Sequence, residues 1–84
     1  MLNGQSADPE ETAEIRRFFE ERAEIARIFN LITLQLGTDL MVAVKVQLQR
    51  GGLPAEDAIN RVEAELKRRF PQVRWSFFEP DHAD

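Results

Sequence analysis

The chain contains no cysteine, no tyrosine and a single histidine. Without cysteine, disulfide bonds, thiolate metal ligands and thiol catalysis are excluded. Long hydrophobic runs are also missing: the longest, LMVAV, covers only residues 40–44, whereas a membrane-spanning helix needs about 20 apolar residues. The first ten residues have neither a basic stretch nor an apolar core, so no secretory signal is predicted. We therefore expect a soluble segment that does not insert into a membrane.

Basic charge is in the minority, with eleven Lys and Arg residues against fifteen Asp and Glu residues and a net charge of −4. This balance disfavours a nucleic-acid-binding protein, which needs a basic surface to contact phosphates. A glycine-rich phosphate loop, an HExxH motif and a Ser-His-Asp spacing are all missing from the sequence. A lone histidine without an orienting partner is a poor general base. We therefore do not expect an enzyme.

The periodicity of apolar residues predicts two helices and three strands. Asp8 and Pro9 are typical of a helix start, and helical spacing then predicts a helix over 9–26. Alternation predicts strands over 28–36 and 40–48 around a Gly37 turn, followed by a helix over 55–69 and a strand over 73–78. This α-β-β-α-β order is typical of an α+β two-layer sandwich with both helices on one face of a small sheet.

The other face of the predicted sheet is left bare and carries large apolar side chains. The alternation offers Phe29, Leu31, Thr33 and Gln35 from the first strand, Met41, Ala43, Lys45 and Gln47 from the second, and either Val73, Trp75 and Phe77 or Arg74, Ser76 and Phe78 from the third. Monomers rarely leave a large apolar patch unused. We therefore expect a homodimer, with Phe29, Leu31, Trp75 and Phe77 in its interface.

Four potential metal ligands follow the last strand: Glu79, Asp81, His82 and Asp84. Their nitrogen and oxygen atoms suit a divalent ion such as Zn, Mn, Fe or Co. The alternative is a solvated chain end, because terminal residues usually fray and Pro80 interrupts the backbone. The sequence leaves both interpretations open.

Three segments, IFNLITLQLGTDLMVAVKVQL, AINRVEAELKRRFP and VRWSFFEPD, carry a family resemblance. Together with Gly37 after the first strand, the Glu63…Phe70-Pro71 helix end and the Glu79-Pro80 strand end, they resemble the cytoplasmic C-terminal domain of cation diffusion facilitator transporters. The resemblance implies a ferredoxin-like, metallochaperone-like fold. It also implies a linker from a membrane domain over 1–8, a regulatory domain over 9–80 and a polar tail over 81–84.

In that family the membrane domain of the same chain exchanges divalent cations for protons, and this domain dimerises, binds metal at the dimer interface and regulates transport. The resemblance thus implies a homodimer on the cytoplasmic side of the membrane. A free-standing ferredoxin-like module that binds a small ligand or a protein is the alternative.

The chain departs from the family at the residues that hold zinc. Zinc-binding relatives carry histidines where this chain has Phe29, Lys45 and Phe77, and of that site only Glu79 remains. The family's usual metal site is therefore expected to be weak or absent. Asp81 and His82 could form a relocated site, and Glu56 and Asp57 fall where some relatives place another ligand. The alternative is that contacts through Phe29 and Phe77 have replaced the metal as the link between protomers.

Overall fold

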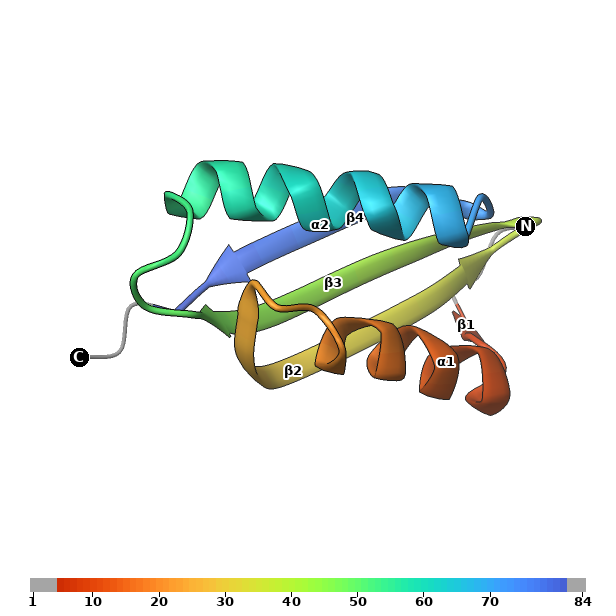
Figure 1. The fold of residues 1–84 in the computed structure, drawn as a ribbon. Coiled ribbons are helices and arrows are strands. Elements are labelled where there is room, and N and C mark those ends of the chain that lie inside the picture. Colours follow the sequence, from red (N-terminus) through yellow and green to blue (C-terminus); the bar gives the residue numbers. More distant parts are fainter. Residues whose placement is uncertain (1–4, 82–84) are drawn as a thin grey trace.

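The computed structural model describes residues 5–81. Its elements are β1 (Gln5–Ser6), α1 (Pro9–Glu20), β2 (Ile25–Leu36), β3 (Asp39–Leu48), α2 (Ala55–Arg69) and β4 (Val73–Pro80). The strands form one sheet in the order β1-β2-β3-β4 (Figure 1). β2 and β3 make the predicted hairpin, and β4 runs parallel to β3 because α2 carries the chain back across the sheet. The predicted α+β sandwich and its element order are confirmed; the two-residue β1 is an addition.

The first helix begins where the sequence indicates and ends earlier. The side chain of Asp8 accepts a hydrogen bond from the backbone N–H of Glu10, and Pro9 follows at the first helical position. The prediction that the helix continues to Ala26 is wrong, because α1 ends at Glu20. Ile25 is buried as the first residue of β2, opposite Leu48. Burial in the sheet therefore outweighs the helical pattern here.

α2 has the predicted bounds, and its charges suit its dipole. Glu56 and Asp57 lie in its first turn, and Lys67, Arg68 and Arg69 lie in its last. β4 continues two residues past the predicted end at Phe78, to Pro80.

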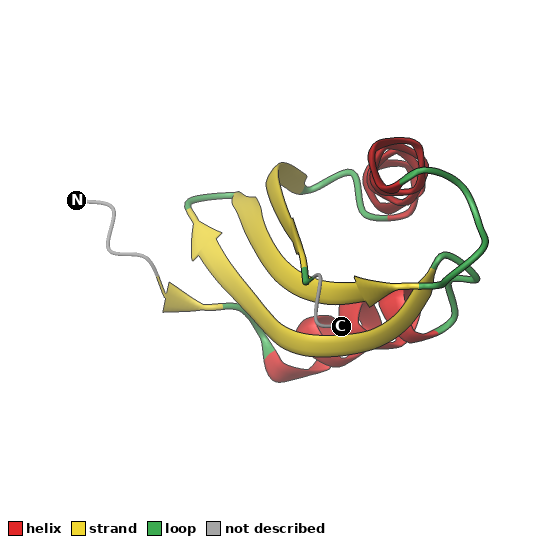
Figure 2. Ribbon diagram, turned by 90° about the vertical axis from the view of Figure 1, so that its left-hand side faces the viewer, coloured by secondary structure: helices red, strands yellow, loops and turns green. Residues whose placement is uncertain are grey.

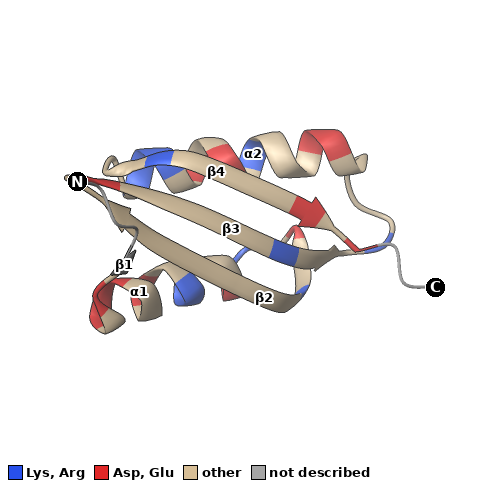
Figure 3. Ribbon diagram, turned by 180° about the vertical axis from the view of Figure 1, so that it is seen from behind, with Lys and Arg blue, Asp and Glu red and all other residues tan. Residues whose placement is uncertain are grey.

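The core lies between the two helices and one face of the sheet. Figure 1 shows both helices in front of the strands, and Figure 3, from behind, shows the strands in front of the helices. The buried cluster takes Ile15, Phe18 and Phe19 from α1, Val62 and Leu66 from α2, and Leu40, Val42, Val44 and Val46 from β3. The Phe18 ring meets Phe19 and Phe70 edge-on, and Phe19 meets Phe78. Neither α1 nor α2 covers the opposite face of the sheet.

Irregularities in β2 decide which of its side chains face the core. The pairing with β3 shifts register between Ile25 and Arg27 and again between Ile28 and Asn30. Such bulges bend a strand, and the long strands are visibly curved in Figure 2. The second shift sends Ile28 and Leu31 to the same side, where both pack against the core. The prediction that Leu31 and Thr33 lie on the bare face is therefore wrong: Thr33 is buried, and its hydroxyl lies 2.8 Å from that of Thr12 in α1.

A candidate interface on the open sheet face

The open face of the sheet is built from rows of side chains that run across three strands. Each row takes one residue from β2, β3 and β4, because paired residues project to the same side. The pairing gives the rows Ile32–Ala43–Phe77 and Leu34–Met41–Trp75. Phe77 is 57% exposed, Ile32 45% and Trp75 40%. The centre of the face is therefore apolar and in contact with solvent.

Each end of this apolar centre carries one ion pair between β3 and β4. At one end the Lys45 Nζ lies 3.8 Å from the Glu79 Oε2. At the other end the Arg74 Nη1 lies 3.8 Å from the Asp39 Oδ2, and the Arg74 guanidinium sits 5.6 Å from the centre of the Trp75 ring. Figure 3 shows charged residues towards the ends of these strands and none in the middle. Exposed pairs of this kind contribute only about 0–1 kcal/mol to stability.

A shallow hollow of about 450 Å³ opens on the same face. Its apolar floor comes from Ile32, Ala43 and Phe77, and Asn30, Lys45 and Glu79 line its polar side. Asn30 is paired with Lys45, and Lys45 with Glu79, so the polar side is itself one cross-strand row. The hollow can receive an apolar side chain that has a polar neighbour.

The structure brings together some of the predicted interface residues and separates others. Trp75 and Phe77 lie on the open face, whereas Leu31 packs against the core on the other side. Phe29 is 41% exposed at the bulge of β2, with the Arg27 guanidinium 5.5 Å from its ring centre. Sequence reasoning missed Ile32, because strict alternation placed it in the core.

The predicted metal ligands do not form a cluster in the part of the chain that the structure describes. Within residues 5–81, no three His, Cys, Asp or Glu side chains are arranged to hold a metal ion. The carboxylate of Glu79 is paired with Lys45, and the backbone N–H of Asp81 donates to the carbonyl of Val46 at 2.8 Å. Glu56 and Asp57 are exposed on α2. His82 and Asp84 lie outside the described residues, so a site in the tail stays a prediction.

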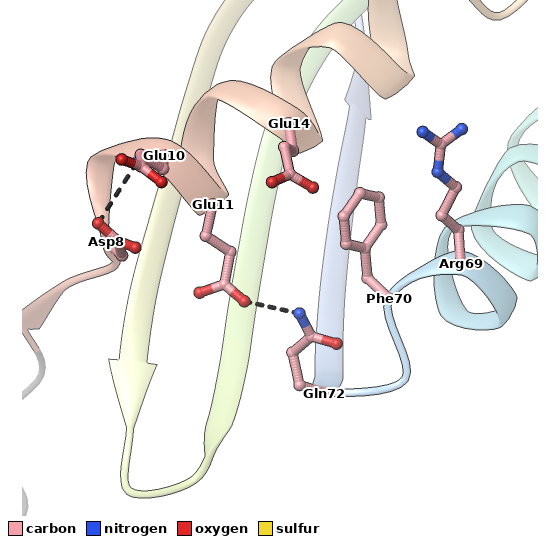
Figure 4. A pocket seen from close by; sticks show the side chains of 7 residues that line it. All are labelled: Asp8, Glu10, Glu11, Glu14, Arg69, Phe70 and Gln72. Atoms are coloured by element: carbon pink, nitrogen blue, oxygen red, sulfur yellow. Dashed lines mark hydrogen bonds between the residues drawn. The ribbon is translucent and has the colours of Figure 1, made fainter.

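A second hollow, which sequence reasoning did not predict, lies between the start of α1 and the turn before β4 (Figure 4). It has a volume of about 420 Å³ and is lined by Asp8, Glu10, Glu11, Glu14, Arg69, Phe70 and Gln72. The amide of Gln72 donates a hydrogen bond to the Glu11 carboxylate at 2.6 Å. This contact joins α1 to the turn before β4 across the end of the sandwich.

Comparison with known proteins relates this chain to a solved structure of a putative zinc transporter. Neither a protein-family model nor a curated protein sequence matches the chain. Among solved structures, the chain is similar to one described as "Mode of Action of a Putative Zinc Transporter CzrB (Zn form)". The identity is 25%, the TM-score is 0.71, and the match covers 94% of each chain.

This likeness confirms the resemblance to the C-terminal domain of cation diffusion facilitator transporters and supports a transporter-related domain. None of the helices within residues 5–81 has the length and apolarity needed to cross a membrane.

Proposed function

We propose that the chain is the cytoplasmic regulatory and dimerisation domain of a divalent metal cation efflux transporter. Its membrane part would exchange cations for protons, and the domain itself would carry out no catalysis. The observation that carries the proposal is the likeness to the CzrB structure, which extends over 94% of both chains at a TM-score of 0.71. Agreement over 94% of both chains supports a shared domain rather than a shared short motif.

The open sheet face supports a role in dimerisation. Ile32, Trp75 and Phe77 are each at least 40% exposed on one face, and Ala43 and Met41 lie between them. A contiguous apolar patch of this kind on a small soluble domain usually marks an interaction site. An 84-residue domain also has a small core, so burial of this face would add to its stability.

Lys45 supports a dimer that does not depend on metal at the family's usual site. Its ammonium group lies 3.8 Å from Glu79, the one acidic residue that the resemblance retains at that site. A fixed positive charge next to a carboxylate repels a divalent cation and already supplies the opposite charge. We propose that apolar contacts and ion pairs hold the protomers together where relatives use zinc.

The second candidate function is a free-standing module that binds a small ligand or a protein. The hollow of about 450 Å³ beside Lys45 favours it, because it combines an apolar floor with a cationic group. The natural reading frame upstream of Leu2 separates the two functions: coding for membrane spans supports the transporter domain, and a stop codon supports the free-standing module.

Sedimentation velocity tests the proposed function, with the protein measured once in EDTA and once during a zinc titration. We expect a concentration-dependent dimer in EDTA whose dissociation constant zinc leaves unchanged. A dimer that forms or compacts only with zinc would show that a metal site, such as one involving Asp81 and His82, links the protomers. A monomer at the highest attainable concentration in both conditions would contradict the dimerisation role.

A further inference from the structure

The hollow beside Lys45 brings two opposite charges and an apolar floor together on the open face. Its lining comes from two neighbouring rows, the polar row Asn30–Lys45–Glu79 and the apolar row Ile32–Ala43–Phe77. The floor is low at Ala43, because this small side chain stands between two large ones. The next row has the larger Met41 at its centre, and none of its residues lines this hollow.

The two charged groups keep hydrogen-bonding capacity for a ligand. The Lys45 Nζ lies 3.8 Å from the Glu79 Oε2, which is a charge contact but too long for a hydrogen bond. An ammonium group has three N–H donors, and a carboxylate accepts through two oxygens. The side-chain amide of Asn30, which is paired with Lys45, adds donors on the side away from Glu79. The polar row therefore offers donors at one end and an acceptor at the other.

We propose that this hollow binds an α-amino acid with an apolar side chain, in its zwitterionic form. The ligand's carboxylate accepts hydrogen bonds from Lys45 and Asn30, and its ammonium group donates to Glu79. Its side chain lies over Ala43, between the two larger side chains of the apolar row. Every charge then has an opposite charge as its neighbour, so the contact between Lys45 and Glu79 is kept.

The spacing of the two rows fits a single amino acid. The nitrogen and the carboxylate oxygens of an amino acid are about 3 Å apart across Cα, from standard bond lengths. This separation is close to the 3.8 Å between the Lys45 and Glu79 groups. Successive side chains on one face of a strand are about 7 Å apart, so the side chain of a leucine or methionine held at the polar row reaches the apolar row. The volume of about 450 Å³ lies within the usual range for small-molecule sites.

The charge pair selects a zwitterion over a ligand with one charge. A simple carboxylate would be attracted by Lys45 and repelled by Glu79, and a simple amine would meet the reverse. The pair of Arg74 with Asp39, at the other end of the open face, has the same separation of 3.8 Å, but neither residue lines this hollow. That pair is therefore a matched control for the effect of charge alone.

The inference goes beyond the proposed function, because binding needs only one copy of the chain. Its test is a titration with L-leucine followed by amide NMR, at a protein concentration at which sedimentation velocity shows the monomer. Because the hollow is shallow, we expect a dissociation constant on the order of 1 mM, with shifts centred on Ala43, Lys45 and Phe77. Isocaproate lacks leucine's ammonium group, isoamylamine lacks its carboxylate and glycine lacks its side chain. Each of the three should bind at least tenfold more weakly.

Variants of the two charges give a readout that misfolding could not imitate, because the preference between ligands should reverse. Glu79→Gln should weaken leucine binding at least tenfold but strengthen isocaproate binding, since the repulsion of a carboxylate is removed. Lys45→Gln should weaken leucine binding to the same extent but strengthen isoamylamine binding. The control variants Asp39→Asn and Arg74→Gln should leave all three affinities unchanged.

Ala43→Met tests the apolar floor. It places at this position the side chain that Met41 has in the next row, so it should fill the hollow and abolish leucine binding. Leucine binding that survives in this variant would place the ligand elsewhere and overturn the inference. Isocaproate or isoamylamine binding as tightly as leucine would also overturn it.

The outcomes separate this inference from the proposed function. If wild type dimerises but leucine causes no saturable shifts, the inference is overturned while the dimerisation role stands. If leucine binds and the chain stays a monomer at every concentration, the inference stands and the dimerisation role falls. If both hold, leucine should raise the apparent dissociation constant of the dimer, because the hollow lies on the face assigned to the dimer interface.

Discussion

Phe77 is the most exposed large apolar residue of the open face, and its environment argues for a contact that the single chain does not supply. It stands in a row with Ala43 and Ile32, next to the hollow beside Lys45. A phenyl ring that is 57% exposed contributes little to the stability of the monomer. Burial of this ring against a partner would therefore contribute free energy to association.

We therefore expect Phe77→Asp to abolish dimerisation. The dissociation constant should rise by at least a hundredfold, because each copy would bury an unpaired carboxylate in an apolar interface. The free energy of unfolding of the monomer should change by no more than about 0.5 kcal/mol, as for other exposed sites. Sedimentation velocity and urea unfolding measure the two effects.

Leu53→Asp is the matched control. Leu53 is also exposed, at 44%, but it lies in the connection before α2 rather than on the open face. This variant should dimerise like wild type. Equal loss of dimer in both variants would mean that the added negative charge, rather than the lost contact, separates the copies.

At the scale of elements, α2 and β3 could be predicted closely from the sequence, and β2 could not. β3 alternates strictly, with Leu40, Val42, Val44 and Val46 all buried, so the period of two was sufficient. In β2 the shift between Ile28 and Asn30 reverses the side to which later residues project. The sequence of an apolar strand does not show where a bulge lies. Strict alternation therefore placed Leu31 on the wrong face and Ile32 in the core. β1 was missed because two residues carry no periodicity.

The candidate site was partly predictable for the same reason. Trp75 and Phe77 were recognised because aromatic residues alternate in β4, although the sequence left the parity of that strand open. The ion pair of Arg74 with Asp39 depends on the register shift between Leu40 and Met41 in the pairing of β3 with β4. The register between strands that are far apart in the sequence depends on tertiary packing. It therefore cannot be predicted from the local pattern of apolar residues.

α1 is held to the sheet by apolar side chains, and one of them gives a prediction for this element. Phe19 is fully buried and contacts Phe18 and Phe78 edge-on. Phe19→Ala removes a large buried side chain and leaves a cavity, so it should lower the free energy of unfolding by about 3–5 kcal/mol. Urea unfolding followed by circular dichroism measures the change.

The control makes the same chemical substitution at an exposed ring. Phe29 is 41% exposed at the bulge of β2, so Phe29→Ala should lower the free energy of unfolding by less than about 1.5 kcal/mol. Similar losses for the two variants would show that the bulge of β2 is as tightly packed as the core, contrary to the burial described above.

For the whole molecule, a chain of this size has a limited core, and association becomes part of its stability. A domain of about this length buries only a little more than 60% of the surface of its unfolded chain. A partner that binds only the folded state stabilises that state by mass action. If the open face is the dimer interface, the thermal stability of the molecule depends on its concentration.

We therefore expect the Tm of the wild-type chain to rise with protein concentration. Across a hundredfold range above the dissociation constant, mass action adds about 1.4 kcal/mol per protomer. In a domain of 60–100 residues each kcal/mol raises the Tm by about 4–8 °C. Differential scanning calorimetry should thus show an increase of several degrees. The Tm of Phe77→Asp should stay constant over the same range, because a monomer unfolds independently of concentration. A wild-type Tm as constant as that of this variant would mean that the open face stays exposed in the folded protein and that its apolar rows serve a different partner.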